Sequence, residues 1–366
     1  METYFAVAAP GLEPILLQEL QALGLSAQAE AGGVSFRSDL AGLYRANLQL
    51  LTASRILARL GNFFYATSFE QLEARAARLP WERFLSPGRP VELRVTCHRS
   101  RLYHSGAVAG SISKAIAARL GRPSPAGQDP QLVVVRLAEN RCTISIDSSG
   151  ELLHRRGYRQ AVARAPLRET LAAALLLSSG WDLASPLLDP FCGSGTIPIE
   201  AARMALGIPP GSGRRFAFMD WPGYEPLRWS ALLAEARPHP AAAGLVIQAS
   251  DRDAGAVRMA GENAERGGVA GAIEFSCRAI SAITPPAGPG WIVTNPPYGT
   301  RLSGGGDLRD LYARLGQVLR RCCPGWGALI LCSDPALLGQ TRLGLETGLA
   351  LRNGGIRVYV GRGRVG

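Results

Sequence analysis

The sequence predicts an α/β protein in two parts, an α+β N-terminal half followed by a doubly wound, mostly parallel sheet. Two observations predict this fold class. Up to about residue 160, helices and short strands alternate with hairpins, and from about residue 165 the order strand, turn, helix repeats. At 366 residues the chain is also longer than one average domain, so two or three domains are expected.

The N-terminal half contains two short runs of alternating strands and helices. The first run predicts a strand, an amphipathic helix, a returning strand and a further helical stretch, over residues 3–9, 11–24, 32–36 and 40–60. The second run predicts a strand, a helix and a hairpin, over residues 89–97, 105–121 and 131–149. Two small α+β units are therefore expected before residue 160.

The C-terminal half repeats a hydrophobic strand, a polar corner and a helix. Its strands are expected over residues 185–189, 242–251, 290–295 and 327–334. Its helices are expected over residues 195–206, 254–268 and 308–322. Near the end, Asn353-Gly354 lies between two β-like runs, which predicts an antiparallel hairpin at one edge of the sheet.

The chain is strongly basic, with a formal net charge of +11 and a pI of about 9.8. Lys114 is the only lysine, so 39 of the 40 basic residues are arginine. A genomic preference for arginine would explain that ratio, but not the excess of positive over negative charge. Because arginine binds phosphate in a bidentate manner and stacks on bases, nucleic acid is the expected partner.

The composition argues against several other classes of protein. The seven cysteines are an odd number without a C-x-x-C pair, so neither a disulfide framework nor a structural zinc is expected, and no metal is predicted. No apolar run approaches the roughly 18 residues of a membrane span, and the N-terminus has no basic start or cleavable apolar segment. We therefore expect a soluble cytoplasmic protein without a membrane partner.

The first of two polar corners is DPFCGSGT, residues 189–196, where a strand ends and a helix begins. Gly193 and Gly195 would let the backbone approach a ligand closely, with the helix N-terminus facing a negative group. The corner is not a Walker loop, which needs Gly-Lys-Ser/Thr, nor a dinucleotide fingerprint, because Pro198 stands at the third glycine position. S-adenosyl-L-methionine fits, as a cofactor that needs close backbone approach without a pyrophosphate.

Two further residues near this corner have competing interpretations. Cys192 could be a nucleophile with a lowered pKa at a helix start, but a packing role is favoured, because no suitable histidine is near in sequence. Asp251 ends the next predicted strand, where a carboxylate can hold ribose hydroxyls, and an ordinary surface aspartate is equally compatible. It lies 56 residues beyond Gly195, so residues 207–240 are interpreted as an insertion.

The second corner is NPPY, residues 295–298, at the end of the strand WIVT. The side-chain carbonyl of Asn295 and the rigidly held carbonyl of Pro296 could accept the two hydrogens of an exocyclic amine, and Tyr298 could stack on the attached base. Alone, such a motif is more often a turn. Because it follows the glycine corner at another strand end, we expect both corners to face one crevice and to align an amine for methyl transfer.

Segments of a recognisable order cover nearly the whole chain: APGLEPILLQEL, GGVSF, LYRANLQLLTASRIL, HRSRLYHSGAV, HRRGYRQAVARAPLRETLAAALL, DPFCGSGTIPIEAA and NPPYGTRL. Together they resemble the THUMP-containing class I S-adenosyl-L-methionine-dependent RNA guanine-N2 methyltransferases. FAFMDWP and LRNGGIRVYV are most similar to the bacterial 23S rRNA subgroup. The alternatives are a tRNA guanine-N2 methyltransferase, an adenine-N6 DNA methyltransferase that shares NPPY, and an RNA-binding protein without catalysis.

The resemblance implies a Rossmann-like class I methyltransferase domain, with an antiparallel hairpin at the edge of a mostly parallel sheet, after an α+β THUMP-containing region. The implied parts are a ferredoxin-like α+β subdomain, a THUMP RNA-binding domain, a basic linker and the methyltransferase domain. They would cover residues 1–62, 63–152, 153–168 and 169–366, respectively.

The resemblance also implies the site residues. Those that bind the cofactor would be Asp189, Phe191, Cys192, Gly193, Gly195, Thr196, Asp251, Pro166, Thr170 and Asn295. Those that hold the target base would be Asn295, Pro296, Pro297 and Tyr298. In one respect the sequence departs from the family, which usually has an aspartate near the cofactor adenine. FSCRAISAIT offers only Arg278, Ala279 and Ser281 there.

Two basic segments are expected to contact structured RNA, with rRNA as the first choice and tRNA as the second. The linker over 153–168 has five arginines and no acid, and HRSRLYH places two arginines beside a tyrosine. The expected contacts are Arg99, Arg101, Tyr103, Arg155, Arg156 and Arg159. A solvated charged face is the alternative for each arginine. A monomer is expected, and the sequence does not identify the modified nucleotide.

Overall fold

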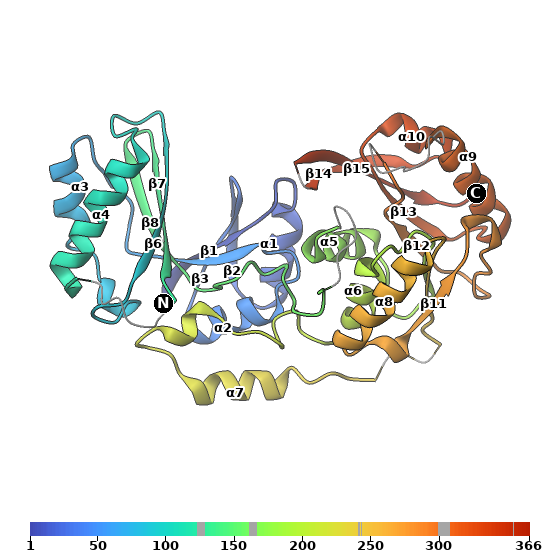
Figure 1. The fold of residues 1–366 in the computed structure, drawn as a ribbon, viewed down its shortest axis with the longest axis horizontal. Coiled ribbons are helices and arrows are strands. Elements are labelled where there is room, and N and C mark those ends of the chain that lie inside the picture. Colours follow the sequence, from blue (N-terminus) through green and yellow to red (C-terminus); the bar gives the residue numbers. More distant parts are fainter. Residues whose placement is uncertain (123–128, 161–166, 241, 243, 299–307, 354) are drawn as a thin grey trace.

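The computed structural model describes residues 1–122, 129–160, 167–240, 242, 244–298, 308–353 and 355–366. Within these residues the strands form two sheets, one of eight strands in the N-terminal half and one of seven strands in the C-terminal half. The two halves lie one after the other along the long axis of the molecule (Figure 1).

The N-terminal sheet has the order β2-β3-β1-β4-β8-β7-β6, and β5 also pairs with β8. Its strands are β1 (Glu2–Val7), β2 (Ser26–Glu30), β3 (Gly33–Ser38), β4 (Arg55–Arg59), β5 (Phe64–Tyr65), β6 (Val91–His98), β7 (Gln131–Ala138) and β8 (Arg141–Asp147). Its helices are α1 (Glu13–Ala22), α2 (Leu40–Gln49), α3 (Phe69–Ala76) and α4 (Ser105–Leu120). Because β4 pairs antiparallel with β8, one sheet runs through both of the small units expected from the sequence.

The hairpin expected over residues 131–149 is confirmed, and the helical stretch expected over 40–60 is wrong beyond residue 49. β7 and β8 are joined by a two-residue turn in which Glu139 and Asn140 have φ of 54° and 63°. After α2 the chain turns into β4, where Ile56 and Ala58 are fully buried between β1 and β8. Pairing on both sides therefore overrides the local helical preference of this segment.

The doubly wound C-terminal sheet is confirmed. Its order is β11-β10-β9-β12-β13-β15-β14, parallel except for β15 and β14 at one edge. The strands are β9 (Leu187–Asp189), β10 (Ile247–Asp251), β11 (Ile273–Cys277), β12 (Trp291–Thr294), β13 (Gly327–Cys332), β14 (Glu346–Asn353) and β15 (Ile356–Arg364). The helices are α5 (Glu169–Ser179), α6 (Thr196–Ala205), α7 (Pro226–Glu235), α8 (Ala254–Arg266), α9 (Leu308–Cys322) and α10 (Pro335–Gln340). β14 and β15 form the edge hairpin that Asn353-Gly354 predicted, although Gly354 itself lies outside the described residues.

The segment interpreted as an insertion, residues 207–240, crosses from the C-terminal half to the N-terminal half and carries α7 (Figure 1). The N–H of Phe218 donates to the carbonyl of Ser148 at 3.0 Å, and its ring stacks on Tyr44 with 4.5 Å between centroids. Arg89 donates to the Asp220 carboxylate at 3.0 Å. These contacts fix the orientation of one half relative to the other.

Among the helices that the structure describes, none combines the length and the apolarity needed to span a bilayer. The same residues contain no group of three or more His, Cys, Asp or Glu side chains arranged to hold a metal ion.

Candidate functional site

The two polar corners lie side by side at the carboxyl edge of the C-terminal sheet. β9 and β12 are parallel neighbours, and each ends at one of the corners. The hydroxyl of Thr294, at the end of β12, donates a buried 2.6 Å hydrogen bond to Oδ1 of Asp189, at the end of β9. Because the order of the strands reverses at β9, this edge is where a doubly wound sheet binds its ligand.

The glycine corner leaves open space at Gly193 but not at Gly195. Gly193 has φ of 52°, and a Cβ there would meet no atom of the described residues within 4 Å. Gly195 has φ of 85°, and a Cβ there would lie 3.0 Å from the Cβ of Ala260 and 3.2 Å from Cδ1 of Ile199. Gly195 therefore lets α6 pack against α8, whereas the backbone at Gly193 is open to the close approach that S-adenosylmethionine needs.

Asp251 supports the glycine corner from the neighbouring strand. One of its carboxylate oxygens accepts the N–H of Gly193 at 3.0 Å, and the other accepts the N–H of Asp253 at 3.0 Å. Each carboxylate oxygen has a further lone pair. The half-buried Asp251 can therefore shape the loop and still accept hydrogen bonds from the hydroxyls of a ribose.

Asn263 on α8 also holds the glycine corner, and it is absent from the residues expected on sequence grounds. Its side chain is fully buried, and Nδ2 donates to the carbonyl of Ser194 at 3.0 Å. Its Oδ1 accepts from Arg266 at 2.6 Å, and Nε of Arg266 donates to the carbonyl of Tyr158 at 2.9 Å. The sequence did contain a signal for this role, since Asn263 lies on the apolar side of an amphipathic helix. A buried amide at such a position needs hydrogen-bond partners.

The carboxyl group of Asp189 is buried between the two corners. The pKa of Asp189 is raised to about 7, mainly by burial and to a smaller extent by the nearby charge of Asp251, against the opposing effect of hydrogen bonds from Thr294 and the N–H of Phe191. Near neutral pH the group is thus poised between its acid and carboxylate forms, and its protonation is linked to folding.

Asp189→Asn is expected to remove a pH dependence of stability between about pH 4 and pH 7. Because the pKa of Asp189 is higher in the folded state than in the unfolded state, the free energy of unfolding falls as pH rises through this window. One proton contributes at most about 1.4 kcal/mol per pH unit. Urea denaturation at several pH values should show wild type losing stability relative to the variant as pH rises. A constant difference would contradict this role of Asp189.

Gly193→Val is expected to weaken the binding of S-adenosylmethionine at least tenfold while the fold stays native. The two added methyl groups occupy the open space beside the backbone, and the left-handed φ adds about 1–2 kcal/mol of strain. Calorimetry measures the affinity, and circular dichroism checks the fold. Gly195→Ala is the control, which should lower the melting temperature because its Cβ meets α8. Unchanged affinity in Gly193→Val would make the loop purely structural.

The remaining residues of the glycine corner lie in or near the interior. Cys192 is buried, and burial raises the pKa of its thiol well above the usual range, which supports the packing role and not a nucleophile. Phe191 is half-buried, and Thr196 is buried at the first turn of α6. Thr170 is buried in the first turn of α5, and Pro166 lies outside the described residues, so the expected contacts with the adenosyl group stay predictions.

Asn295 presents a buried acceptor that has no partner among the residues described by the structure. Its Oδ1 is inaccessible to solvent and forms no hydrogen bond within the described part of the chain. An unpaired buried acceptor costs about 1–3 kcal/mol, so its presence at a strand end points to a ligand that supplies the hydrogen. Pro296 is buried beside it, and the carbonyl of the half-buried Pro297 accepts from the hydroxyl of Tyr312 at 3.4 Å.

Tyr298 is not the open stacking surface that the sequence suggested. Its ring is 1% exposed, and its hydroxyl accepts a 3.0 Å hydrogen bond from Nδ2 of Asn353, at the end of β14. A Cβ at Gly11 would lie 2.5 Å from the carbonyl oxygen of Ala350, also on β14. The edge hairpin therefore lies between the N-terminal half and the second corner, and a base can reach this ring only if neighbouring groups shift.

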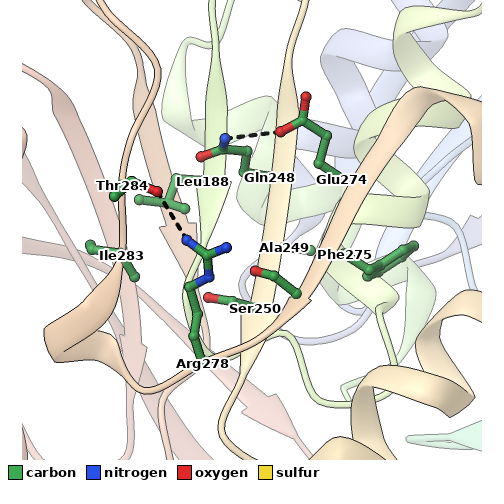
Figure 2. Close-up of a pocket in the computed structure, with 10 residues that line it drawn as sticks. Leu188, Gln248, Ala249, Ser250, Glu274, Phe275, Arg278, Ile283 and Thr284 are labelled. Carbon is green, nitrogen blue, oxygen red and sulfur yellow. Dashed lines mark hydrogen bonds between the residues drawn. The ribbon is translucent and has the colours of Figure 1, made fainter.

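A cavity of about 210 Å³ lies against β10 and β11 (Figure 2). β10 is the strand whose last residue, Asp251, supports the glycine corner. The cavity is bordered by Ser250, whose buried hydroxyl has no partner among the described residues, and by Arg278, which donates to the Thr284 hydroxyl at 2.9 Å. The N–H of Arg278 also donates to the carbonyl of Asp251 at 2.9 Å. Arg278 thus orders the loop in which the family's usual aspartate is missing.

The predicted phosphate contact of Arg156 is wrong, because its side chain is buried and bonded inside the protein. The contact predicted for the half-buried Arg159 stays a prediction. The buried guanidinium of Arg156 donates to the carbonyl of Leu51 at 2.6 Å and lies 3.6 Å from the carboxylate of Glu200. Arg159 donates to the carboxylate of Glu169 at 2.6 Å. Arg156 therefore joins the N-terminal half to the C-terminal half, whereas Arg159 holds the start of α5.

The other expected RNA contacts are exposed. Arg155 points to solvent and pairs with a carboxylate four residues earlier at 3.1 Å. Arg99, Arg101 and Tyr103 follow β6, and Tyr103 is 80% exposed. The N–H of Arg101 donates to Oδ1 of Asn140 at 2.8 Å, which holds this loop beside the β7–β8 turn. These four residues stay predicted contacts.

Three protein-family models match the chain. A methyltransferase domain described as RMKL-like matches residues 156–345, a THUMP domain matches residues 66–147, and an RlmL ferredoxin-like domain matches residues 3–57. The boundaries expected from the sequence at residues 62, 152 and 168 stay predictions.

Curated relatives match almost the whole chain. The ribosomal RNA large subunit methyltransferases K/L of Methylococcus capsulatus and Magnetococcus marinus are each 38% identical over 94% of this chain, and the matches cover 48% and 50% of those proteins. The Synechocystis protein slr0064, named as an RNA methyltransferase, is 36% identical over 96% of this chain and 94% of its own length. The chain thus spans about half the length of the K/L relatives.

Solved structures share both halves of the molecule. SMU.472 in complex with SAH is 29% identical, with a TM-score of 0.89 over 99% of this chain and 97% of that one. A predicted N6-adenine-specific DNA methylase from Listeria monocytogenes is 33% identical, with a TM-score of 0.87 over 98% and 95% of the two chains. TrmN from Thermus thermophilus is 25% identical, with a TM-score of 0.72 over 99% of both chains.

Proposed function

The chain belongs to the RMKL-like methyltransferase family, and we propose that it methylates the exocyclic N2 amine of a guanine in structured RNA, with S-adenosylmethionine as the methyl donor. The substrate that the comparisons favour is large-subunit ribosomal RNA, which the names of the K/L relatives specify. A THUMP domain and a net charge of +11 support a polyanionic substrate.

The glycine corner is the proposed binding site for the cofactor. The open space at Gly193 fits a ligand that lies against the backbone, and Asp251 offers acceptors for a ribose at the adjacent strand end. S-adenosylmethionine supplies an electrophilic methyl group on a sulfonium. The relative crystallised with SAH has the same fold over almost its whole length, which supports this assignment.

The observation that carries the proposal is that Oδ1 of Asn295, beside the glycine corner, is buried and has no partner in the described parts of the chain. This oxygen and the carbonyl of Pro296 would accept the two hydrogens of the target amine. Two directed hydrogen bonds hold the nitrogen with its lone pair toward the methyl group, so alignment at near-attack distance replaces a strong general base. The extra proton leaves the amine after the methyl group has been transferred. Because the amine lies within stacked RNA, the base has to be extruded, which favours an unpaired nucleotide.

The experiment that tests the proposed substrate is transfer of a labelled methyl group. The purified protein is incubated with tritiated S-adenosylmethionine in three separate reactions. These contain rRNA, tRNA or DNA, each lacking the modification. Incorporation into large-subunit rRNA supports the proposal, and incorporation into tRNA alone supports the runner-up. Labelling of DNA alone supports the adenine-N6 alternative, which the Listeria neighbour's description favours. No incorporation, despite cofactor and RNA binding, would indicate a binding protein.

A further inference from the structure

Strands β6, β7 and β8 lie with one face toward helix α4 (Figure 1), and the opposite face carries exposed side chains, chiefly on β6 and near the β7–β8 turn. On β6 every second residue is exposed. The strand register places Thr96 of β6 beside Arg136 of β7, and Ala138 of β7 beside Arg141 of β8. These outward positions form one surface, here called the open sheet face. Its main residues are Arg59, Phe63, Tyr65, Arg94, Arg136 and Arg141.

The open sheet face collects one arginine from each of four adjacent strands. Arg59 lies on β4, Arg141 on β8, Arg136 on β7 and Arg94 on β6. Burial lowers the pKa of Arg59, and the like charges of Arg136 and Arg141 lower it further, while Glu30 opposes this. The lowered pKa of Arg59 is mainly an effect of burial, and the positive charges of Arg136 and Arg141 are smaller contributions. Such a cluster is unfavourable until an anion neutralises it.

The carboxylates near this face neutralise only part of its charge. Arg94 pairs with Glu92 at 3.3 Å, an exposed contact that contributes little. Within the described part of the chain, no carboxylate lies within 4.0 Å of a guanidinium nitrogen of Arg136 or Arg141. The face therefore keeps positive charge available for an anionic ligand.

Two exposed aromatic rings, Phe63 and Tyr65, lie at the end of the open sheet face that carries Arg141. Phe63 and Tyr65 are 51% and 57% exposed, and their rings meet edge to face with 6.0 Å between centroids. The guanidinium of Arg141 lies over the Phe63 ring, 4.8 Å from its centroid. Among the described residues, the exposed aromatic side chains all lie within residues 63–103. Phe63 and Tyr65 are therefore exposed beside a positive cluster, whereas most aromatic rings of the described residues are buried or half-buried.

We propose that the open sheet face binds an unpaired segment of the RNA substrate, with Arg94, Arg136 and Arg141 on phosphates and Phe63 and Tyr65 stacking on bases. This inference rests on the proposed function and adds a substrate feature to it. Exposed rings can stack only on bases that have left a duplex, and flat sheets with rings and arginines are suited to single strands. The face thus selects RNA that offers a single-stranded stretch near the methylated site.

The test uses the full chain and a fluorescently labelled 12-nucleotide RNA, both single-stranded and annealed to its complement. Binding is measured by anisotropy at several salt concentrations. Arg94→Gln, Arg136→Gln and Arg141→Gln together should weaken binding of the single strand at least tenfold. The log–log salt slope should fall by about two, at roughly 0.7 for each lost contact. The matched control replaces Arg75 on α3, Arg78 just after α3 and Arg119 on α4 by Gln, which removes equal charge from the helical side and should leave binding near wild type.

A second variant tests stacking without changing charge. Phe63→Ala with Tyr65→Ala should weaken single-strand binding about fivefold or more and leave the salt slope unchanged. Leu227→Ala, at an exposed position on α7, is its control. Equal losses of RNA affinity in the two triple-arginine variants, or tighter binding of the duplex than of the single strand, would overturn the inference. Methylation of rRNA by the wild type would still support the proposed function in that case. A wild type that binds neither RNA and methylates none would overturn both.

Discussion

Asn295→Ala is expected to lower the rate of methyl transfer by roughly thirtyfold to a thousandfold while the affinity for S-adenosylmethionine barely changes. The variant removes one of the two acceptors that we propose to orient the amine, and losing such a bond in the transition state costs about 2–4 kcal/mol. The glycine corner and Asp251 are untouched. Single-turnover kinetics on the RNA substrate and calorimetry with the cofactor measure the two quantities separately.

The structure adds a stability readout to this prediction. Because Oδ1 of Asn295 has no partner within the described residues, its removal leaves no broken hydrogen bond and should not lower the melting temperature. Asn295→Asp keeps an acceptor at the same position and should retain more activity than the alanine variant. An alanine variant as fast as wild type would show that Asn295 does not hold the amine.

Arg156→Ala is expected to lower the free energy of unfolding by about 3–5 kcal/mol, the cost of leaving one partner of a buried ion pair uncompensated. The change leaves the carboxylate of Glu200 without its cation and the carbonyl of Leu51 without its donor. Urea denaturation measures the loss. The same variant should show little change in the salt dependence of RNA binding at temperatures where it remains folded.

Arg155→Ala is the matched control. The side chain of Arg155 is exposed, and its ion pair with Glu151 is a surface contact. The effect of Arg155→Ala on stability should stay within about 0.5 kcal/mol. If Arg156→Ala were as stable as wild type but bound RNA with a flatter salt slope, the original interpretation of Arg156 as a phosphate contact would be restored.

Much of the fold could be predicted because local signals and tertiary structure agree. The glycine and proline corners, each after a hydrophobic run, marked the ends of β9 and β12, and Asn353-Gly354 marked the edge hairpin. Residues 55–59 were assigned to a helix because their apolar pattern is short and ambiguous. Only pairing with β1 and β8, far away in sequence, makes them a strand.

The sequence predicted that the two corners meet, but it did not reveal the residues that support them from other elements. Asp189 and Thr294 meet because their strands are neighbours, which the order of elements implied. The amides of Asn263 and Asn353 reach the two corners from α8 and β14, and no motif marks them. Arg156 looked like part of a basic track because charge can be read from a sequence, whereas burial against Glu200 cannot.

The most direct test of the central claim is to identify the methylated atom. Large-subunit rRNA lacking the modification is incubated with the protein and S-adenosylmethionine, digested to nucleosides and separated by liquid chromatography with mass spectrometry. We expect a peak that co-migrates with N2-methylguanosine for the wild type, and no such peak for Asn295→Ala after the same short incubation. Methylation on N6 of adenine, or on a carbon or ribose oxygen of any nucleoside, would contradict the claim that this site holds the amine of a guanine.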